Sequence, residues 1–286
     1  MERMKEEYPI TALAEALEVS KSGFFAHRRK GEQPRRRADD ELVRAILPIF
    51  AASRQTCGSP RLVAALRRQG VRCGKNRVAR LMRENHLRPK QKRRRWRPVT
   101  TISNHRQPVA ENWLAQVPAP SRPNQVWVAD ITYLDTAEGW LYVVGILDAC
   151  TRQLVGWQTG ETLEAGLVTR AWQKAVAARR PGPRLLHHSD RGSQYASAAM
   201  AARLAKRGAA ASMSREGNGY DNAMMESFWA TLKTECFHGE RPASRQAARL
   251  QLFDYVEGFY NRTRLHGGLG YQSPLAFEKS LRDGED

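Results

Sequence analysis

Cysteine is scarce in the 286-residue sequence, and its placement excludes two kinds of small-domain scaffold. The four cysteines are scattered with no C-x-x-C pair, which supports neither a disulfide framework nor a zinc knuckle. Long apolar runs are also missing, since none approaches the roughly 20 residues that span a bilayer. The first residues, MERMKEEYP, lack the apolar core of a signal peptide. We therefore expect no membrane contact.

Acidic residues are few in the first third of the chain. Residues 1–106 carry 27 Lys and Arg against 10 Asp and Glu, a net charge of +17, whereas residues 107–286 carry 20 against 19, a net charge of +1. Double-stranded DNA is the simplest partner for so basic a front, because each neutralised phosphate releases condensed counterion. An anionic membrane is the alternative, and the missing apolar runs argue against it. We expect a cytoplasmic, nucleoid-associated protein.

Helical patterns dominate the basic front. Residues 1–31 are predicted to form a helical hairpin, which is either a helix-turn-helix fragment or an ordinary pair packing on the body. Residues 38–90 are predicted to form a helical DNA-binding domain, in which Ser59 and Pro60 begin one helix and Gly70 ends it. A second helix then follows and is expected to direct four cations toward phosphates or a DNA groove: Lys75, Arg77, Arg80 and Arg83.

A basic and proline-rich linker is predicted at residues 91–123. It contains most of KQKRRRWR, residues 90–97, which is the densest charge run of the chain. Beside a basic helical domain, we expect Arg93, Arg94 and Arg95 to follow a phosphate backbone. Five prolines between residues 98 and 123 favour extended chain over a packed element.

Strand patterns begin at residue 125. Three β-rich segments, at 125–136, 140–150 and 153–159, follow one another closely. Helices at 163–178 and 197–207 then alternate with strands at 184–189 and 210–214. This order predicts an α/β fold, with a mixed sheet of ribonuclease H type flanked by helices. We expect this core at residues 124–240, preceded by the basic all-helical, helix-turn-helix-like domain.

Three acidic residues stand where such a core carries its chemistry. Asp130 interrupts an apolar strand, Asp190 follows a strand, and Glu226 lies on a helix predicted for residues 222–237. Sites of open α/β sheets lie at strand ends, and three carboxylates form an oxygen-rich pocket that suits Mg²⁺ or Mn²⁺. Two such ions, about 4 Å apart, can promote in-line displacement at phosphorus. Lys233 lies about two turns after Glu226 on the same helix face.

The order and spacing of these residues resemble a known family. Asp190 and Glu226 have 35 residues between them, and Lys233 follows Glu226 by seven, a pattern similar to that of DDE transposases and retroviral-type integrases. The segments DITYL, HSDRGSQY, YDNAMMESFWATLKTE and YNRTRLHGGLGYQSP look like the OrfB-type transposase of the insertion sequence three family. The resemblance extends over about residues 8–280. One departure is Cys57, which stands where the family usually has an aromatic residue.

The resemblance implies a polynucleotidyl transferase. Asp130, Asp190 and Glu226 would be the catalytic residues and would hold two Mg²⁺ ions, with Mn²⁺ as a substitute. The activity implied is DNA strand cleavage followed by 3′-hydroxyl strand transfer, with Lys233 touching DNA near the reacting phosphate. The resemblance also implies a homo-oligomer on DNA and frameshift fusion to an upstream helix-turn-helix protein. The alternatives are a metal-dependent nuclease without strand transfer and a non-catalytic DNA-binding regulator.

Other acids lie near the predicted site. Asp148 closes the second strand, and a turn or hydrogen-bonding role is favoured over a place in the pocket. Asp135 falls on the opposite strand face from Asp130 by its odd spacing. Asp221 is expected to cap the helix that carries Glu226. None of the three is predicted to bind metal.

Residues 241–286 are expected to form a C-terminal helix and a basic tail that pack on the core. An amphipathic helix at 245–261 is predicted to bury Leu250, Phe253, Val256 and Tyr260. Cations beside two glycines then suit close approach to phosphate. Together with a cation beside Asp190, the contacts to DNA expected in this half of the chain are Arg191, Arg262, Arg264 and His266.

Overall fold

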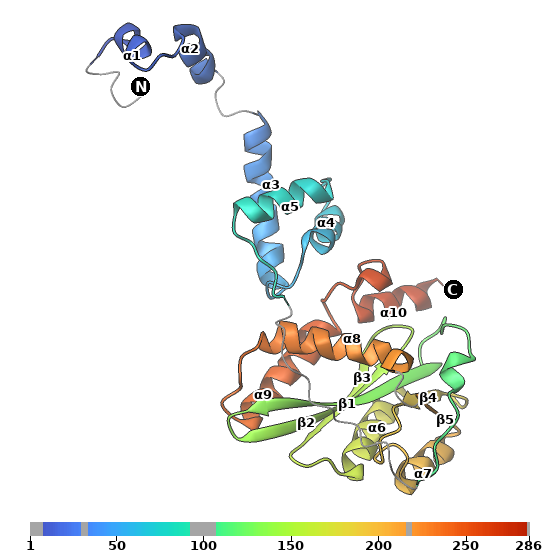
Figure 1. Ribbon diagram of the computed structural model, residues 1–286. Helices are drawn as coiled ribbons and strands as arrows, with labels where there is room; N and C mark the ends of the chain where they lie inside the picture. Colours follow the sequence, from blue (N-terminus) through green and yellow to red (C-terminus); the bar gives the residue numbers. More distant parts are fainter. Residues whose placement is uncertain (1–7, 30–33, 92–106, 216–218, 285–286) are drawn as a thin grey trace.

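The computed structural model describes residues 8–29, 34–91, 107–215 and 219–284. An α/β body carries a small helical unit on one side, and two further helices lie beyond that unit (Figure 1). The helices of the front are α1 (Ile10–Ala16), α2 (Lys21–Arg29), α3 (Pro34–Ala52), α4 (Ser59–Arg68) and α5 (Lys75–Glu84). Within the described ranges, no helix is long and apolar enough to cross a membrane.

The helices α3, α4 and α5 form the helical unit around a core of their own. Ile46, Leu62, Leu66 and Val78 are fully buried in it, and Cys57 joins them at 4% exposure. Gly58 is the extended N-cap of α4, so Ser59 lies inside the helix and not at its cap. The predicted two-helix arrangement of residues 59–86 is therefore present, with the first boundary shifted by one residue.

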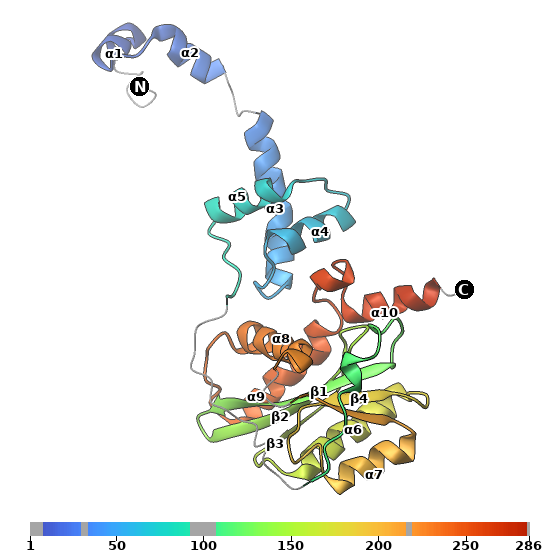
Figure 2. The same ribbon diagram turned by 45° about the vertical axis from the view of Figure 1, so that its right-hand side comes forward.

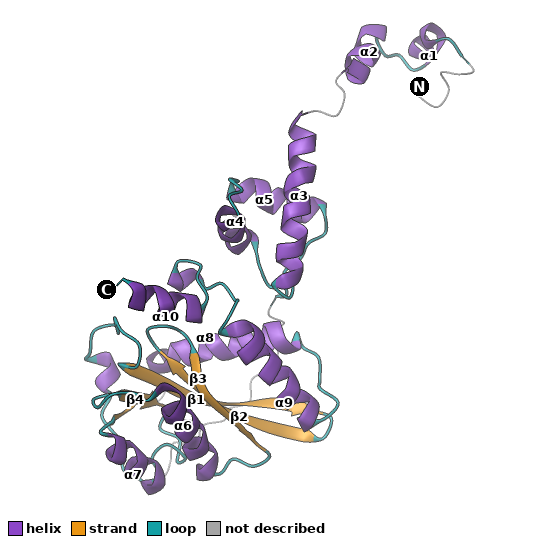
Figure 3. Ribbon diagram, turned by 180° about the vertical axis from the view of Figure 1, so that it is seen from behind, coloured by secondary structure: helices purple, strands orange, loops and turns teal. Residues whose placement is uncertain are grey.

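Five strands form one mixed sheet in the order β3-β2-β1-β4-β5. The strands β1, β2 and β3 pair antiparallel, whereas β4 runs parallel to both β1 and β5 (Figure 3). This arrangement confirms the predicted α/β fold with a mixed sheet. The strands are β1 (Val126–Thr136), β2 (Gly139–Asp148), β3 (Leu154–Gly160), β4 (Leu186–Ser189) and β5 (Ala210–Met213).

Each face of the sheet has its own hydrophobic core. On one face, Trp127 contacts Trp172 edge to face at 5.5 Å, in a core shared with α6 (Ala165–Arg179) and α7 (Ala198–Arg207). On the other face, Val128 packs with Phe228 and Trp229 of α8 (Ala223–Leu232) and with α9 (Arg245–Phe253). The helix α8 lies between the sheet and the helical unit (Figure 2).

Two π-helices change the predicted helix faces. They are η3 (Lys233–Phe237), which continues α8, and η4 (Asp254–Tyr260), which continues α9. An α-helical period predicts Cys236 on the buried stripe, yet Glu235 and Phe237 are the buried residues of η3. A π-turn closes on the fifth residue and not the fourth, so each residue advances less around the helix axis.

The predicted anchors of the C-terminal helix are partly wrong for the same reason. Leu250 and Phe253 are 61% and 59% exposed, whereas Val256 and Tyr260 are buried as expected. The change from α9 to η4 rotates the two halves of the segment relative to each other. The remaining short elements are η1 (Trp113–Ala115), η2 (Gly219–Asn222), η5 (Gly267–Leu269) and α10 (Pro274–Asp283).

Candidate active site

Asp130 and Asp190 are brought together by the pairing of β1 and β4. Val128 pairs with His188 in parallel register, and each Asp follows its paired residue by two positions. Side chains two residues apart share one face of a strand, so Asp130 lies on the same face as Val128, the α8 side, while Asp190 follows directly after the end of β4. The site therefore begins at the point where β4 ends and β1 continues.

A tryptophan of α8 holds Asp130. The indole Nε1 of Trp229 donates a hydrogen bond to Asp130 Oδ2 at 3.0 Å. The Trp229 ring lies over Gly145, which pairs with Asp130 across β1 and β2, and a Cβ at Gly145 would come within 2.7 Å of that ring. The lack of a side chain at Gly145 thus allows the indole to reach the carboxylate.

Asp190 lies in a tight turn directly after β4. The backbone N–H of Gly192 donates to Asp190 Oδ1 at 2.9 Å. In the same turn, the Arg191 Nε donates to the carbonyl oxygen of Ser214 at 2.7 Å, just beyond β5. These bonds fix the backbone that carries the second carboxylate.

The three acids interact electrostatically. The pKa of Asp130 is raised to about 7, first by burial, next by the neighbouring Asp190 charge, and least by Glu226. Hydrogen bonds from the Ile131 backbone and from Trp229 oppose this rise. A carboxyl group whose ionisation is opposed by two like charges is typical of a site that a cation completes.

Glu226 is the most accessible of the three acids. It lies in the first turn of α8 and is exposed, and it contributes to the raised pKa of Asp130. In the part of the chain that the structure describes, no three His, Cys, Asp or Glu side chains are close enough together to hold a metal ion. Asp190 is the nearer charge to Asp130 and Glu226 the weaker one, so Glu226 does not complete a three-acid cluster among the described residues.

Lys233 lies at the end of the same helix. Its Nζ is 4.8 Å from the centroid of the Tyr133 ring, as a cation–π contact. Tyr133 in turn meets Trp140 edge to face at 5.0 Å. The ammonium group is therefore oriented by an aromatic pair on the β1–β2 hairpin.

Two residues close to the acids are not predicted from the sequence. Trp229 has the spacing of a core residue, and only the structure shows its N–H on Asp130. Tyr195 is buried, and its hydroxyl makes no hydrogen bond to another described residue. Burial and the charges of Asp130 and Asp190 raise its pKa well above the usual value, so the phenol stays neutral. Tyr195 is the last residue of the HSDRGSQY segment, and its place there was the one sequence feature that could have pointed to it.

The competing acids have other functions. Asp148 accepts backbone hydrogen bonds from Cys150 and Thr151, which confirms the turn role. Asp135 pairs with Arg241 at 2.9 Å, away from the site. The capping role predicted for Asp221 is wrong, because its carboxylate binds Arg215 and Asn112. Asn222 occupies the N-cap of α8, without a side-chain cap.

The two histidines before Asp190 are structural. His187 is 2% exposed and packs edge to face on Trp172 at 5.2 Å. Both ring nitrogens of His188 contact hydroxyls, those of Ser212 and Ser214. Burial lowers the pKa of His187 to about 3 and that of His188 to about 4, so both rings are neutral near pH 7.

The cations predicted on α5 divide into two pairs. Lys75 and Arg83 are exposed. Arg77 and Arg80 instead reach Asp39 of α3, at 2.7 and 2.6 Å, and are only half-exposed. Arg93, Arg94 and Arg95 lie outside the described residues, so their predicted contacts stay predictions.

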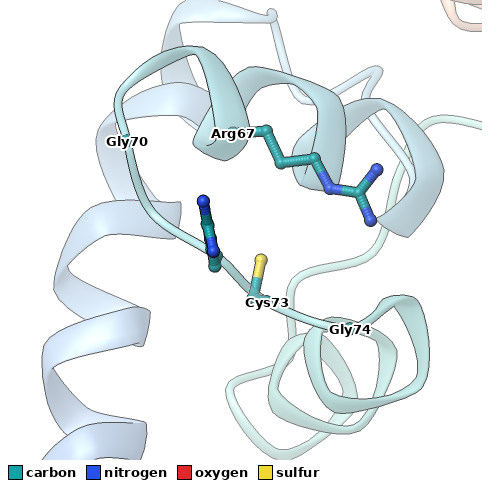
Figure 4. A pocket seen from close by; sticks show the side chains of 5 residues that line it. Arg67, Gly70, Cys73 and Gly74 are labelled. Atoms are coloured by element: carbon teal, nitrogen blue, oxygen red, sulfur yellow. The ribbon is translucent and has the colours of Figure 1, made fainter.

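A basic pocket lies at the turn between α4 and α5. Its volume is about 830 Å³, and Figure 4 shows the Arg67 side chain and the Cys73 thiol on either side of it. Burial raises the pKa of Cys73, opposed by Arg67 and Arg77, so the thiol stays protonated. The full lining is Arg67, Gly70, Arg72, Cys73 and Gly74.

The cations predicted near the C-terminus also differ in their surroundings. Arg262 is exposed, and its Nε donates to the Glu257 carbonyl oxygen. Arg264 is 7% exposed and forms a two-pronged ion pair with Glu235, at 2.6 and 2.7 Å. His266 is partly buried and accepts a hydrogen bond at Nε2 from Arg264 at 3.2 Å.

Comparisons with known proteins agree with this architecture. Two family models described as "Integrase core domain" match residues 120–219 and 226–281, and one described as "HTH-like domain" matches residues 37–95. Among solved structures, the HTLV-2 integrase catalytic core domain in complex with magnesium aligns with a TM-score of 0.43 and 12% identity. That alignment covers 55% of this chain and 97% of the other.

Two curated relatives match nearly the whole chain. The "Insertion element IS600 uncharacterized 31 kDa protein" of Shigella sonnei is 43% identical over 93% of this chain and 97% of its own length. "Transposase InsF for insertion sequence IS3A" of Escherichia coli K12 is 39% identical, over 97% and 96% respectively. The chain belongs to the IS3 family of insertion-sequence transposases, with an integrase core of the DDE polynucleotidyl transferase type.

Proposed function

We propose that this transposase cleaves DNA at the ends of its insertion sequence and joins the freed 3′-hydroxyl to a target strand. The observation that carries the proposal is that the β1–β4 pairing and α8 bring the acids together, near enough that Asp190 and Glu226 help to raise the pKa of Asp130 to about 7. Such mutual repulsion is expected where acids converge to bind a common cation. The family membership supports the same chemistry.

The donor set fits Mg²⁺, which prefers carboxylate oxygens. Asp130, Asp190 and Glu226 would hold the metal, and Mn²⁺ would substitute for it. Two ions bound there would supply activation of the attacking oxygen and stabilisation of the leaving oxygen at phosphorus. Glu226 suits the role of an adjustable ligand, because it is exposed and makes no hydrogen bond or ion pair to another described residue.

The groups around the acids hold them in place and supply a nearby positive charge. Trp229 keeps one oxygen of Asp130 in place through its N–H, and this bond also favours the ionised carboxylate. The Gly192 N–H holds one oxygen of Asp190 in place. Lys233, held over Tyr133, supplies a positive charge for a DNA phosphate near the acids.

The proposal also includes double-stranded DNA as the partner and a homo-oligomer assembled on it. The exposed Lys75 and Arg83 of α5 would contact phosphates of the element ends, together with Arg191 and Arg262. Homo-oligomerisation on DNA and frameshift fusion to an upstream helix-turn-helix protein follow from the family resemblance. The transposase would act at the nucleoid.

The test is a joining assay with labelled element-end DNA and Mg²⁺ or Mn²⁺. We expect Asp190→Asn and Glu226→Gln to reduce both cleavage and joining by at least about 1,000-fold while the protein stays folded, since removing one member of an interdependent catalytic set abolishes most of its effect. The control is Asp135→Asn, which should retain activity because Asp135 pairs with Arg241 away from the site.

Other outcomes distinguish the alternatives. Cut DNA without joined product would indicate a nuclease. Full joining activity in Asp190→Asn or Glu226→Gln would contradict the catalytic assignment. Metal-independent DNA binding as the only activity of the wild-type protein would indicate a regulator.

A further inference from the structure

A second pocket lies where the helical unit, α8 and the C-terminal segment meet. Its volume is about 280 Å³. Arg61 of α4 lines it on the helical side, Ser227 and Thr231 line it on α8, and Arg152 and the 264–268 segment close it. In Figures 1 and 2, α8 runs beneath the helical unit with the C-terminal segment beside it. Three parts of the chain far apart in sequence thus build one basic cavity.

The charges that surround this pocket do not balance. Arg61, Arg152 and Arg264 contribute three positive charges. Among the described residues, Glu235 is the one carboxylate paired with them, bonded to Arg264 at 2.6 Å and lying 3.5 Å from Arg61. The surplus of positive charge in a half-buried site favours an anion.

Several hydrogen-bond donors at the pocket make no hydrogen bond among the described residues. The buried Arg61 Nη1 atom is one of them, and its sole ion-pair contact in that part of the chain is Glu235 at 3.5 Å. In the same described part, neither the Arg152 guanidinium nor the Ser227 and Thr231 hydroxyls make a side-chain hydrogen bond. Ser227 and Thr231 are one helical turn apart, so both hydroxyls lie on one face of α8.

The same positive charges act on the His266 ring. Its pKa is lowered to about 3, first by burial and then by Arg264, Arg61 and Arg152, so the ring is neutral. Because Arg264 can only donate, the bonded Nε2 is the acceptor and Nδ1 carries the proton. A further cation is thus disfavoured in this pocket, and an anion is favoured.

We propose that Arg61, Arg152, Ser227 and Thr231 form a binding site for one phosphodiester group of the DNA backbone. The inference rests on the proposed function, since it takes DNA as the substrate. Guanidinium groups and hydroxyls match phosphate oxygens, and Arg forms two-pronged contacts with them. Arg264 is the supporting residue that Glu235 keeps in place, and it is not a ligand.

The position of this site explains what a bound phosphate would do. Ser227 directly follows Glu226 on α8, so a strand held at the pocket passes beside the helix that carries the third acid. Arg61 belongs to the helical unit, whereas Arg152 belongs to the turn after β2. One phosphate would therefore bridge the DNA-binding helices and the catalytic core.

The first experiment uses inorganic phosphate as the probe, so that it does not depend on any activity on DNA. NMR of the full chain, with labelled histidine rings, should show a saturable shift of His266 as phosphate is added. Arg152→Gln should weaken this binding at least 10-fold, whereas Lys174→Gln, an exposed charge change on α6, should not. No shift, or an equal shift in Arg152→Gln, would overturn the site.

The second experiment measures affinity for element-end DNA in the Asp190→Asn background, which removes cleavage from the measurement. We expect Arg61→Gln and Arg152→Gln each to lower the slope of log affinity against log salt by about 0.9, the value for one lost phosphate contact. Lys174→Gln is again the control, and thermal melts check folding. An unchanged slope with phosphate binding intact would overturn the assignment to DNA. If the joining assay showed no activity, the phosphate titration and the DNA affinity could still be interpreted, because neither depends on strand joining.

Discussion

At the scale of single residues, the central feature is an acid kept from ionising easily. Asp130 is placed on an interior strand, opposite Gly145 and under Trp229. Burial and Asp190 oppose its negative charge, and the pKa rises to about 7. An aspartate in the unfolded chain ionises near pH 4. The folded protein therefore bears a free-energy cost at this position whenever the carboxylate is charged and no cation is bound.

The first prediction concerns this cost. Between about pH 4 and 7 the folded state holds a proton that the unfolded state has lost, so stability falls as the pH rises through this window. Asp130→Asn removes the effect. One pKa unit is worth about 1.4 kcal/mol, and the partial exposure of Asp130 reduces the effect. We expect the free energy of unfolding of the variant to exceed that of wild type by roughly 1–3 kcal/mol at pH 8 in EDTA.

The measurement is urea denaturation at pH 5 and pH 8. The gain should shrink toward pH 5, where wild-type Asp130 is mostly protonated. Added MgCl₂ at pH 8 should stabilise wild type more than Asp130→Asn, because a ligand that binds only the folded state raises stability. Asp135→Asn serves as the control. Equal gains at the two pH values would contradict the assigned ionisation.

The second prediction concerns Trp229 as a positioning residue. Trp229→Phe keeps an aromatic ring over Gly145 but removes the N–H that bonds Asp130. That bond lowers the pKa of Asp130, so its loss raises the pKa. We expect the acid limb of the pH–rate profile for joining to move to higher pH. Trp113→Phe, an exposed site on η1, should leave the profile unchanged, and a uniform loss without a shift would indicate a packing role alone.

At the scale of elements, the strands of the sheet were predictable from the sequence, whereas the π-helices that continue α8 and α9 were not. Short apolar segments predicted all five strands, and the first three are also rich in β-branched residues, because pairing and burial act on a local pattern. The acids Asp130 and Asp190 were predictable for the same reason, since each interrupts or ends such a strand. The bond from Trp229 to Asp130 was not, because it depends on how α8 crosses the sheet.

The π-helix η3 shows why periodicity fails locally. Phe237 lies where a regular helix would turn it away from the buried stripe, yet it is 6% exposed. Glu235 is also buried, at 5% exposure. It accepts hydrogen bonds from Tyr255 at 2.8 Å and from Arg264 at 2.6 and 2.7 Å. A buried carboxylate with these partners compensates for the altered helix register, and none of the partners is near it in sequence.

The third prediction tests this element. Glu235→Ala leaves the Arg264 guanidinium buried without its carboxylate, which costs about 3–5 kcal/mol. Glu240→Ala, at an exposed position just after η3, should change the free energy of unfolding by less than about 0.5 kcal/mol. Replacing both partners, as Glu235→Ala with Arg264→Met, should recover part of the loss. A double variant as unstable as the sum of the single ones would contradict the pairing.

At the scale of the whole molecule, the basic front has two tasks. Some of its cations contact the core. Arg54 pairs with Asp254 at 2.7 Å, Arg68 donates to the Tyr271 carbonyl oxygen at 2.7 Å, and Lys90 donates to the Glu235 carbonyl oxygen at 3.0 Å. Net charge alone predicted a polyanion partner, but it did not separate the cations that contact the core from the exposed ones, because that division depends on how the helical unit packs against η3, η4 and the C-terminal segment.

The fourth prediction separates the two tasks with variants of equal charge change. Lys75→Gln with Arg83→Gln removes two exposed cations of α5, and Arg54→Gln with Arg68→Gln removes two that contact the core. If the outer face of α5 binds phosphates, the first pair should lower the salt slope of DNA affinity by about 1.8, from about 0.9 for each contact.

The second pair should leave that slope within about 0.3 of the wild-type value, well below the 0.9 of a single phosphate contact. It should instead destabilise the protein by about 0.5–2 kcal/mol, because partly exposed pairs are worth about 0.2–1 kcal/mol each and the Arg68 bond to a carbonyl oxygen adds a similar amount. Fluorescence anisotropy at several salt concentrations and urea denaturation give the two readouts. Equal effects of both double variants on the slope would mean that DNA senses only the total charge of the front, and the division between docking and DNA-facing cations would then be wrong.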